Sequence, residues 1–134
     1  MIESEDVKRF LLERGCPDDV VEAGLEGLVE GWERTAGEVQ RGYSLGLDDY
    51  LNDLDGRQLI AELLDAFPGA ASPALLEQIA AADALIEQAV SPVDECLWGE
   101  ELADREGWTA EDNWWYFRLP RNPGSQMREE LQGL

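Results

Sequence analysis

Apolar residues recur every three or four positions over residues 17–43, and this spacing constrains the fold more than any other feature of the chain. The stripe comprises Val21, Leu25, Leu28, Trp32, Ala36, Val39 and Tyr43. The period matches the 3.6 residues of an α-helical turn, so all seven side chains would lie on one helix face. Pro17 at the start, followed by two aspartates near the positive end of the helix dipole, is typical of a helix N-terminus. We therefore expect a long amphipathic helix here.

Further helix signals follow along the chain. Short helices are expected after Ser4 and after Ser125, because a serine side chain can accept hydrogen bonds from the unpaired N–H groups of a first turn. Pro73 and Pro92, each preceded by serine, are expected to start two more helices. The second of these should end near Gly107, since glycine commonly terminates helices.

Two glycine patterns predict how the helices continue and meet. Segment 47–67 holds two apolar stripes divided by Asp55-Gly56, which predicts two helices with a break between them rather than one rod. Gly24, Gly27 and Gly31 lie on one stripe of the long helix. Each costs about 1 kcal/mol relative to alanine, so we expect close approach of another helix backbone, with a functional groove as the alternative.

Length and composition favour one helical domain. The chain has 134 residues, 44% of them hydrophobic, which suffices for a single core but not for two ordinary domains. Leucine and alanine dominate and β-branched residues are scarce, which favours helix over strand. The expected fold is all-α: a single-domain bundle of about five or six helices over residues 1–134, with a short extended aromatic segment near the C-terminus.

That aromatic segment is the run Trp114-Trp115-Tyr116-Phe117, followed by Arg118, Leu119 and Pro120. Leu119 should be extended, because the residue before a proline is disfavoured in the helical region. If the whole run is extended, alternate side chains point to opposite faces. Trp115, Phe117 and Leu119 would then close the core. Trp114, Tyr116 and Arg118, which are residue types common at binding hot spots, would either meet a partner or pack within the fold.

The chain is strongly acidic, and its charge is unevenly distributed. The formal net charge is −20; residues 1–112 hold 28 acidic and seven basic residues, whereas residues 113–134 hold two acidic residues and three arginines. A negative field of this size repels nucleic acids and anionic membranes and attracts basic proteins. We therefore expect a basic protein partner, no direct nucleic-acid binding and no membrane association. Adaptation of an acidic helical domain to high salt is an alternative explanation.

Several kinds of chemistry lack their usual residues. The chain has no histidine, no G-x-x-x-x-G-K loop and no G-x-G-x-x-G pattern, which argues against His-based zinc sites, Ser-His or Cys-His nucleophiles and the common phosphate-binding loops. Cys16 and Cys96 lie 80 positions apart and are expected to be reduced, buried thiols. No signal-peptide pattern and no apolar run of ~20 residues occurs. The expected location is the cytoplasm, and no cofactor is expected.

Four carboxylates offer an enzymatic alternative. Glu30-x-x-Glu33 and Glu62-x-x-Asp65 are separated by 28 residues, and this arrangement is similar to the paired acidic motifs of all-α nucleoside triphosphate pyrophosphatases. The resemblance covers these four residues only. It implies that the four carboxylates hold Mg²⁺ against a nucleotide's phosphates. Helical spacing, in contrast, places Glu30 about 200° from Leu28, on the solvent side.

The function expected from these observations is that of a non-enzymatic binding protein, a small acidic bacterial inhibitor of the immunity or antitoxin kind. Its acidic helical face would cover a basic partner by charge complementarity, and the association would weaken as salt rises. A Mg-dependent nucleotide pyrophosphohydrolase is the alternative. The candidate partner contacts are Asp48, Asp49, Asp53, Glu100, Glu101, Asp104, Trp114, Tyr116 and Arg118.

Overall fold

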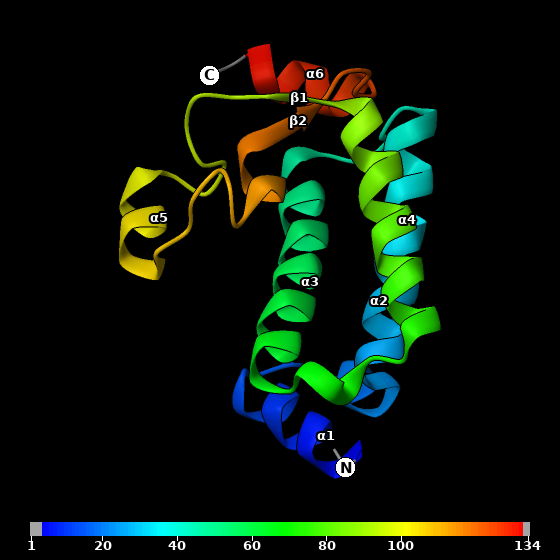
Figure 1. The fold of residues 1–134 in the computed structure, drawn as a ribbon. Helices are drawn as coiled ribbons and strands as arrows, with labels where there is room; N and C mark the ends of the chain where they lie inside the picture. The colour runs from blue at the N-terminus through cyan, green and yellow to red at the C-terminus, as the bar shows by residue number, and fades with distance from the viewer. Residues whose placement is uncertain (1–3, 133–134) are drawn as a thin grey trace.

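The computed structural model describes residues 4–132, and over these residues it confirms the all-α class with six helices and one two-stranded antiparallel sheet (Figure 1). The α-helices are α1 (Ser4–Glu13), α2 (Asp18–Arg41), α3 (Leu47–Ala66), α4 (Pro73–Ala89), α5 (Glu100–Glu106) and α6 (Ser125–Gln132). The short elements are the 3₁₀ helices η1 (Pro68–Ala70) and η2 (Trp114–Phe117) and the strands β1 (Val90–Pro92) and β2 (Arg118–Pro120).

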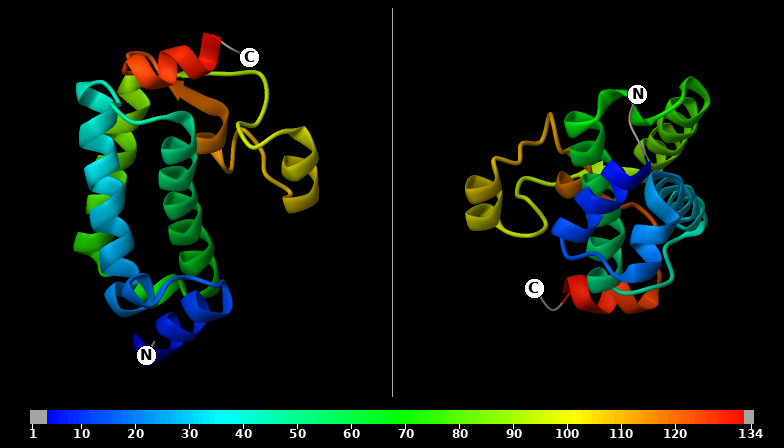
Figure 2. Two further views of the ribbon diagram at one scale, coloured as in Figure 1. Left: turned by 180° about the vertical axis from the view of Figure 1, so that it is seen from behind. Right: turned by 90° about the horizontal axis from the view of Figure 1, so that it is seen from below.

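The three long helices α2, α3 and α4 form the body of the molecule. Helix α2 packs against both α4 and α3, and α1 packs against α2. In Figures 1 and 2, α1 lies across one end of this body and α6 across the other. Helix α5 stands to one side, beyond α3, and is reached by the two segments that leave β1 and enter η2.

The core follows the apolar stripe predicted for α2. Six of its seven residues are buried, and Leu28 is partly buried. Burying a large apolar side chain of this kind contributes about 1.5–3 kcal/mol, so the stripe is a substantial part of the hydrophobic core. The predicted start of α4 is also confirmed, since the Ser72 hydroxyl accepts a hydrogen bond from the Leu75 N–H at 3.1 Å.

Helix α3 runs without interruption through Asp55-Gly56, so the predicted break is wrong. The Asp55 carboxylate does not cap a new helix. It accepts hydrogen bonds instead from the Tyr116 hydroxyl at 2.6 Å and the Trp98 indole at 3.0 Å. A glycine in a helix interior costs about 1 kcal/mol, and the packing of both apolar stripes of α3 outweighs this cost.

The glycines of α2 do not mark a close helix crossing, and that prediction is also wrong. Gly24 has φ +66° and ψ −156°, so it interrupts the helix itself. A Cβ added there would meet only Val7, at 4.0 Å. At Gly31 it would meet only the guanidinium of Arg34, and at Gly27 the nearest atom is the side chain of Ala23 in the same helix. The break at Gly24 requires a left-handed φ that glycine adopts at little cost.

No helix begins at Pro92, which corrects a further prediction: residues 90–92 form strand β1 and residues 93–99 form a loop. Strand β1 pairs antiparallel with β2, so that Ser91 lies opposite Leu119. The extended conformation expected for Leu119 is therefore confirmed. Helix α5 begins only at Glu100, and it ends as predicted at Gly107, which has φ +76°.

Candidate functional site

The aromatic run Trp114–Phe117 forms the 3₁₀ helix η2, so the predicted alternation of its side chains is wrong. In a 3₁₀ helix successive side chains are rotated by about 120°, not by the 180° of a strand. Trp115 and Tyr116 are both buried, with 3% and 0% exposure, whereas Trp114 and Phe117 are partly buried. The run therefore belongs mainly to the core.

Tyr116 is enclosed on all sides, and this corrects its assignment as a partner contact. Its hydroxyl donates to Asp55 at 2.6 Å, and its ring stacks on Trp108 with centroids 4.3 Å apart. Burial, together with the hydrogen bond to Asp55, raises the pKa of the Tyr116 hydroxyl well above its usual value. Tyr116 is consequently a neutral hydrogen-bond donor inside the protein and not a surface anchor.

Between β1 and η2 the chain makes an excursion that we call the acidic arm, residues 93–113. It contains α5, which stands away from α3 in Figures 1 and 2. Backbone hydrogen bonds of 2.8 Å fix its first turn, from the N–H of Val93 to the carbonyl of Phe117 and from that of Leu97 to the carbonyl of Tyr116. Where the arm ends, the Asn113 amide donates to buried Gln58 at 2.9 Å. The arm is thus attached at both ends to the aromatic run and α3.

The acidic arm carries a large uncompensated charge. It has eight acidic residues and one basic residue, Arg105. All eight acidic side chains are exposed; they are Asp94, Glu95, Glu100, Glu101, Asp104, Glu106, Glu111 and Asp112. Trp98 lies among them with 38% of its surface exposed, and its indole N–H bonds to Asp55. An exposed tryptophan beside a dense negative charge is a surface that a basic protein can recognise by both contact and charge.

The predicted contacts on α5, Glu100, Glu101 and Asp104, all lie exposed on this arm. Asp48 and Asp49 are exposed as well, but they belong to the first turn of α3 and not to the arm.

The remaining predicted contacts are less accessible. Trp114 and Arg118 are partly buried, and the Arg118 guanidinium lies 5.2 Å from the centre of the Trp114 ring. The two side chains therefore interact with each other through a cation–π contact.

Asp53, the last of the predicted contacts, is partly buried and engaged within the fold. The Tyr43 hydroxyl donates to it at 2.6 Å. Burial raises the pKa of the Asp53 carboxyl, and the nearby charges of Glu38 and Asp49 raise it further, while the Tyr43 hydrogen bond and Arg34 lower it. Asp53 thus differs from the exposed acids that surround it.

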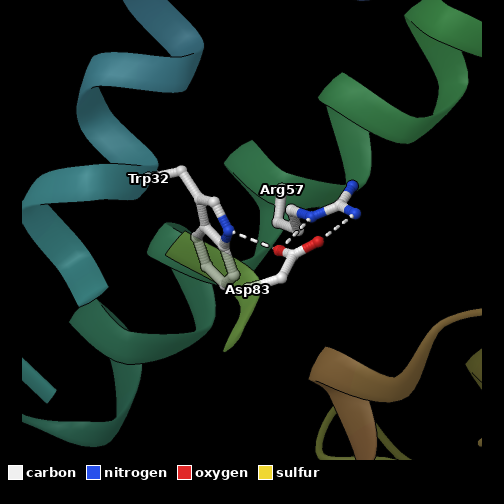
Figure 3. Close-up of polar contacts among 3 residues, drawn as sticks. All are labelled: Trp32, Arg57 and Asp83. Atoms are coloured by element: carbon white, nitrogen blue, oxygen red, sulfur yellow. Dashed lines mark hydrogen bonds and ion pairs between the residues drawn. The ribbon is translucent and has the colours of Figure 1, made fainter. Parts of the chain in front are cut away.

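A polar cluster that the sequence analysis did not find holds η2 in place (Figure 3). Asp83 of α4 accepts hydrogen bonds from Arg57 of α3 and from the indole of Trp32 in α2. The Arg57 guanidinium also lies 4.4 Å from the centre of the Trp115 ring. Three helices and the aromatic run meet at this point. The sequence offers one signal for this cluster: Arg57 is the sole basic residue between positions 42 and 104.

The four carboxylates of the hydrolase alternative do not converge. Glu30 and Glu33 line a cleft beside α2. Glu62 forms an ion pair with Arg14, and Asp65 is exposed on α3. Within residues 4–132, no three or more histidine, cysteine or acidic side chains are grouped so that they could hold a metal ion.

In comparisons with known proteins, no protein-family model, curated protein or solved structure matches the chain. Across the described part of the chain, no helix has both the length and the apolar character needed to cross a membrane. Cys16 and Cys96 are free thiols, and burial raises the pKa of each. The functional argument therefore rests on the geometry and charge of the surface.

Proposed function

We propose that this chain is a non-enzymatic binding protein, a small acidic inhibitor of the immunity or antitoxin kind, which covers the basic surface of a protein partner. The observation that carries the proposal is the acidic arm, which projects from the bundle with eight exposed acids, one base and the exposed Trp98. Inhibition would follow from occlusion, because a partner whose basic surface is covered can no longer reach an anionic substrate.

The charge of the arm would act mainly on the rate of association. Complementary fields steer two proteins together and can raise association rates by orders of magnitude at low ionic strength. At ~0.15 M salt the Debye length is about 8 Å, so exposed charges act only at short range. Binding that depends on the arm should therefore weaken steeply as salt is added.

The attachment of the arm would favour affinity. Trp98 is oriented by its 3.0 Å hydrogen bond to Asp55, and Trp108 is stacked on buried Tyr116. A surface that is already ordered loses less conformational entropy when it binds. The exposed face of Trp98 would supply the apolar contact at the centre of the interface, with the acids of α5 around it.

Affinity capture from a cell lysate at low and at high salt, with identification by mass spectrometry, tests this proposal. We expect the wild-type chain to retain a basic protein stoichiometrically at low salt and to release it at high salt. An arm variant, Glu100→Gln/Glu101→Gln/Asp104→Asn, should lose that protein. The control Asp65→Asn/Glu77→Gln/Glu87→Gln removes the same charge from exposed positions on α3 and α4 and should retain it. Equal retention by both variants, or capture of background proteins alone, would contradict the proposal.

A further inference from the structure

A cleft lies between α1, α2, η1 and the first turns of α4. These elements meet at the end of the bundle opposite α6 (Figure 1). The volume of the cleft is about 700 Å³. Gly24 lines the cleft at the point where its left-handed φ interrupts α2. This interruption changes the direction of the first residues of α2, and the cleft lies beside the interruption. This volume falls within the range of small-molecule sites, about 300–1,000 Å³.

One wall of the cleft is a row of glutamates on α2. Glu22, Glu26, Glu30 and Glu33 all line it, and among the described residues of the lining Lys8 of α1 is the only basic one. Lys8 is already occupied, since its ammonium group lies 3.2 Å from the Glu22 carboxylate. Glu26, Glu30 and Glu33 are exposed, and no hydrogen bond or ion pair engages their side chains within residues 4–132. The wall thus presents three uncompensated negative charges in a row.

The rest of the cleft is largely apolar. Val7 and Leu25 are buried core residues that contribute to its lining, and Ala70 and Leu75 line it from η1 and α4. A ligand that fits both surfaces needs several positive charges in a line, joined by hydrocarbon. From this combination we infer that the cleft binds a linear aliphatic polyamine, whose ammonium groups pair with the glutamates while its methylene groups cover the apolar floor.

The spacing of the charges supports this ligand class. Glu26 and Glu30 are four residues apart and Glu30 and Glu33 three apart, so their Cβ atoms lie about 5–6 Å from one another on the helix surface, and their flexible side chains follow this spacing. Three or four methylene groups hold two amines roughly 5–6 Å apart in an extended chain, given ordinary single-bond lengths of about 1.5 Å. An extended triamine can therefore place one ammonium group beside each of the three glutamates.

A peptide fits the cleft less well than a polyamine. The long walls are helices, whose backbone groups are hydrogen-bonded internally, and the Leu75 N–H at the start of α4 is taken by the Ser72 hydroxyl at 3.1 Å. An extended peptide would find no sheet edge to pair with, and its desolvated amide groups would lack partners. A polyamine has no amide groups, so this cost does not arise. The site is separate from the acidic arm, and its test does not depend on the function proposed for that arm.

Isothermal titration calorimetry with spermidine, at constant ionic strength, tests the inference. We expect saturable one-to-one binding to the wild-type chain. Glu26→Gln/Glu30→Gln should weaken it about tenfold or more, because two charged contacts are lost. Ala74→Phe, which fills the cleft from α4 without changing the charge, should weaken it by a similar factor. The control Glu100→Gln/Glu101→Gln removes the same charge from the arm and should bind within about twofold of wild type.

The outcomes separate a built site from general attraction to an acidic protein. Equal weakening by the arm control and by Glu26→Gln/Glu30→Gln, or binding that does not saturate, would overturn the inference. Circular dichroism verifies that each variant is folded. As a second measurement, spermidine should shift the backbone amide NMR signals of Gly24 and Gly69, which line the cleft, and leave that of Gly107 in the arm unchanged. Shifts spread over all three glycines would also count against the site.

Discussion

Arg57 and Asp83 join the middle of α3 to α4 through two parallel hydrogen bonds, each 2.9 Å long (Figure 3). Both side chains are largely buried, with 12% and 20% exposure. Trp32 adds a third donor from α2, at 2.7 Å from the same carboxylate. A two-pronged pairing of this kind fixes orientation as well as distance. It therefore sets how α3 and α4 meet, and it places Arg57 over the ring of Trp115 in η2.

Replacing Asp83 by alanine should lower the free energy of unfolding by about 3 kcal/mol, because it leaves a largely buried guanidinium and a buried indole N–H without their acceptor. Chemical denaturation measures this value. The control Glu87→Ala removes an exposed acid from the same helix and should change stability by about 0.5 kcal/mol or less. Equal effects of the two substitutions would show that the cluster does not stabilise the fold.

Tyr116→Phe should loosen the acidic arm. The substitution leaves Asp55 without its 2.6 Å hydrogen bond, at an expected cost of about 1–2 kcal/mol. Hydrogen exchange should become faster at the Leu97 amide, which bonds to the Tyr116 carbonyl. Tyr50→Phe is the matched control, since the Tyr50 hydroxyl makes only a 3.4 Å contact with the Arg118 carbonyl. If Tyr50→Phe costs as much as Tyr116→Phe, the Asp55 bond has no special role.

The sequence could predict those features that depend on local chemistry. Helical spacing identified the buried face of α2, glycine chemistry predicted the end of α5 at Gly107, and the proline after Leu119 predicted an extended residue there. Each of these sequence signals lies within a few residues of the helix face, helix end or extended residue that it predicts. The exposed acids of α5 were predictable for the same reason, because charge is a property of each residue.

Features that depend on distant partners could not be predicted. Asp55 lies before a glycine, as in a helix break, but its partners Trp98 and Tyr116 are 43 and 61 residues away in the chain. Those contacts occupy the carboxylate and leave α3 continuous. An extended run places Tyr116 on the face with Trp114 and Arg118, which can either meet a partner or pack within the fold, whereas a 3₁₀ turn rotates the ring inward against Trp108. The arm itself arises from pairing between β1 and β2, which no local pattern indicates.

Salt should stabilise the chain, and Mg²⁺ should have no effect beyond its ionic strength. A net charge of −20 produces self-repulsion that added ions screen. Because Glu62 is paired with Arg14 and the four proposed ligands do not converge, MgCl₂ and NaCl at matched ionic strength should raise the Tm equally in thermal unfolding. An extra rise with Mg²⁺ that Glu62→Ala abolishes would instead support the hydrolase alternative.

Asp53→Asn should stabilise the protein at neutral pH. Burial, with the charges of Glu38 and Asp49, raises the pKa of Asp53 in the folded state above its ordinary value. Between those two pKa values the folded protein binds a proton that the unfolded chain has released, so stability decreases as pH rises through this window. Above it, the ionised carboxylate opposes folding. Asparagine removes that charge, and its side-chain oxygen can still accept the hydrogen bond from Tyr43.

The pH dependence of the Tm distinguishes this cause from a general loss of negative charge. The advantage of Asp53→Asn over wild type should be present at pH 7 and should shrink as the pH falls below the raised pKa, where wild-type Asp53 becomes protonated and neutral too. Asp104→Asn removes the same formal charge from an exposed position in the arm, so at pH 7 it should raise the Tm by less than Asp53→Asn. A lower Tm for Asp53→Asn at pH 7 would mean that the hydrogen bond from Tyr43 to the charged carboxylate outweighs burial and repulsion.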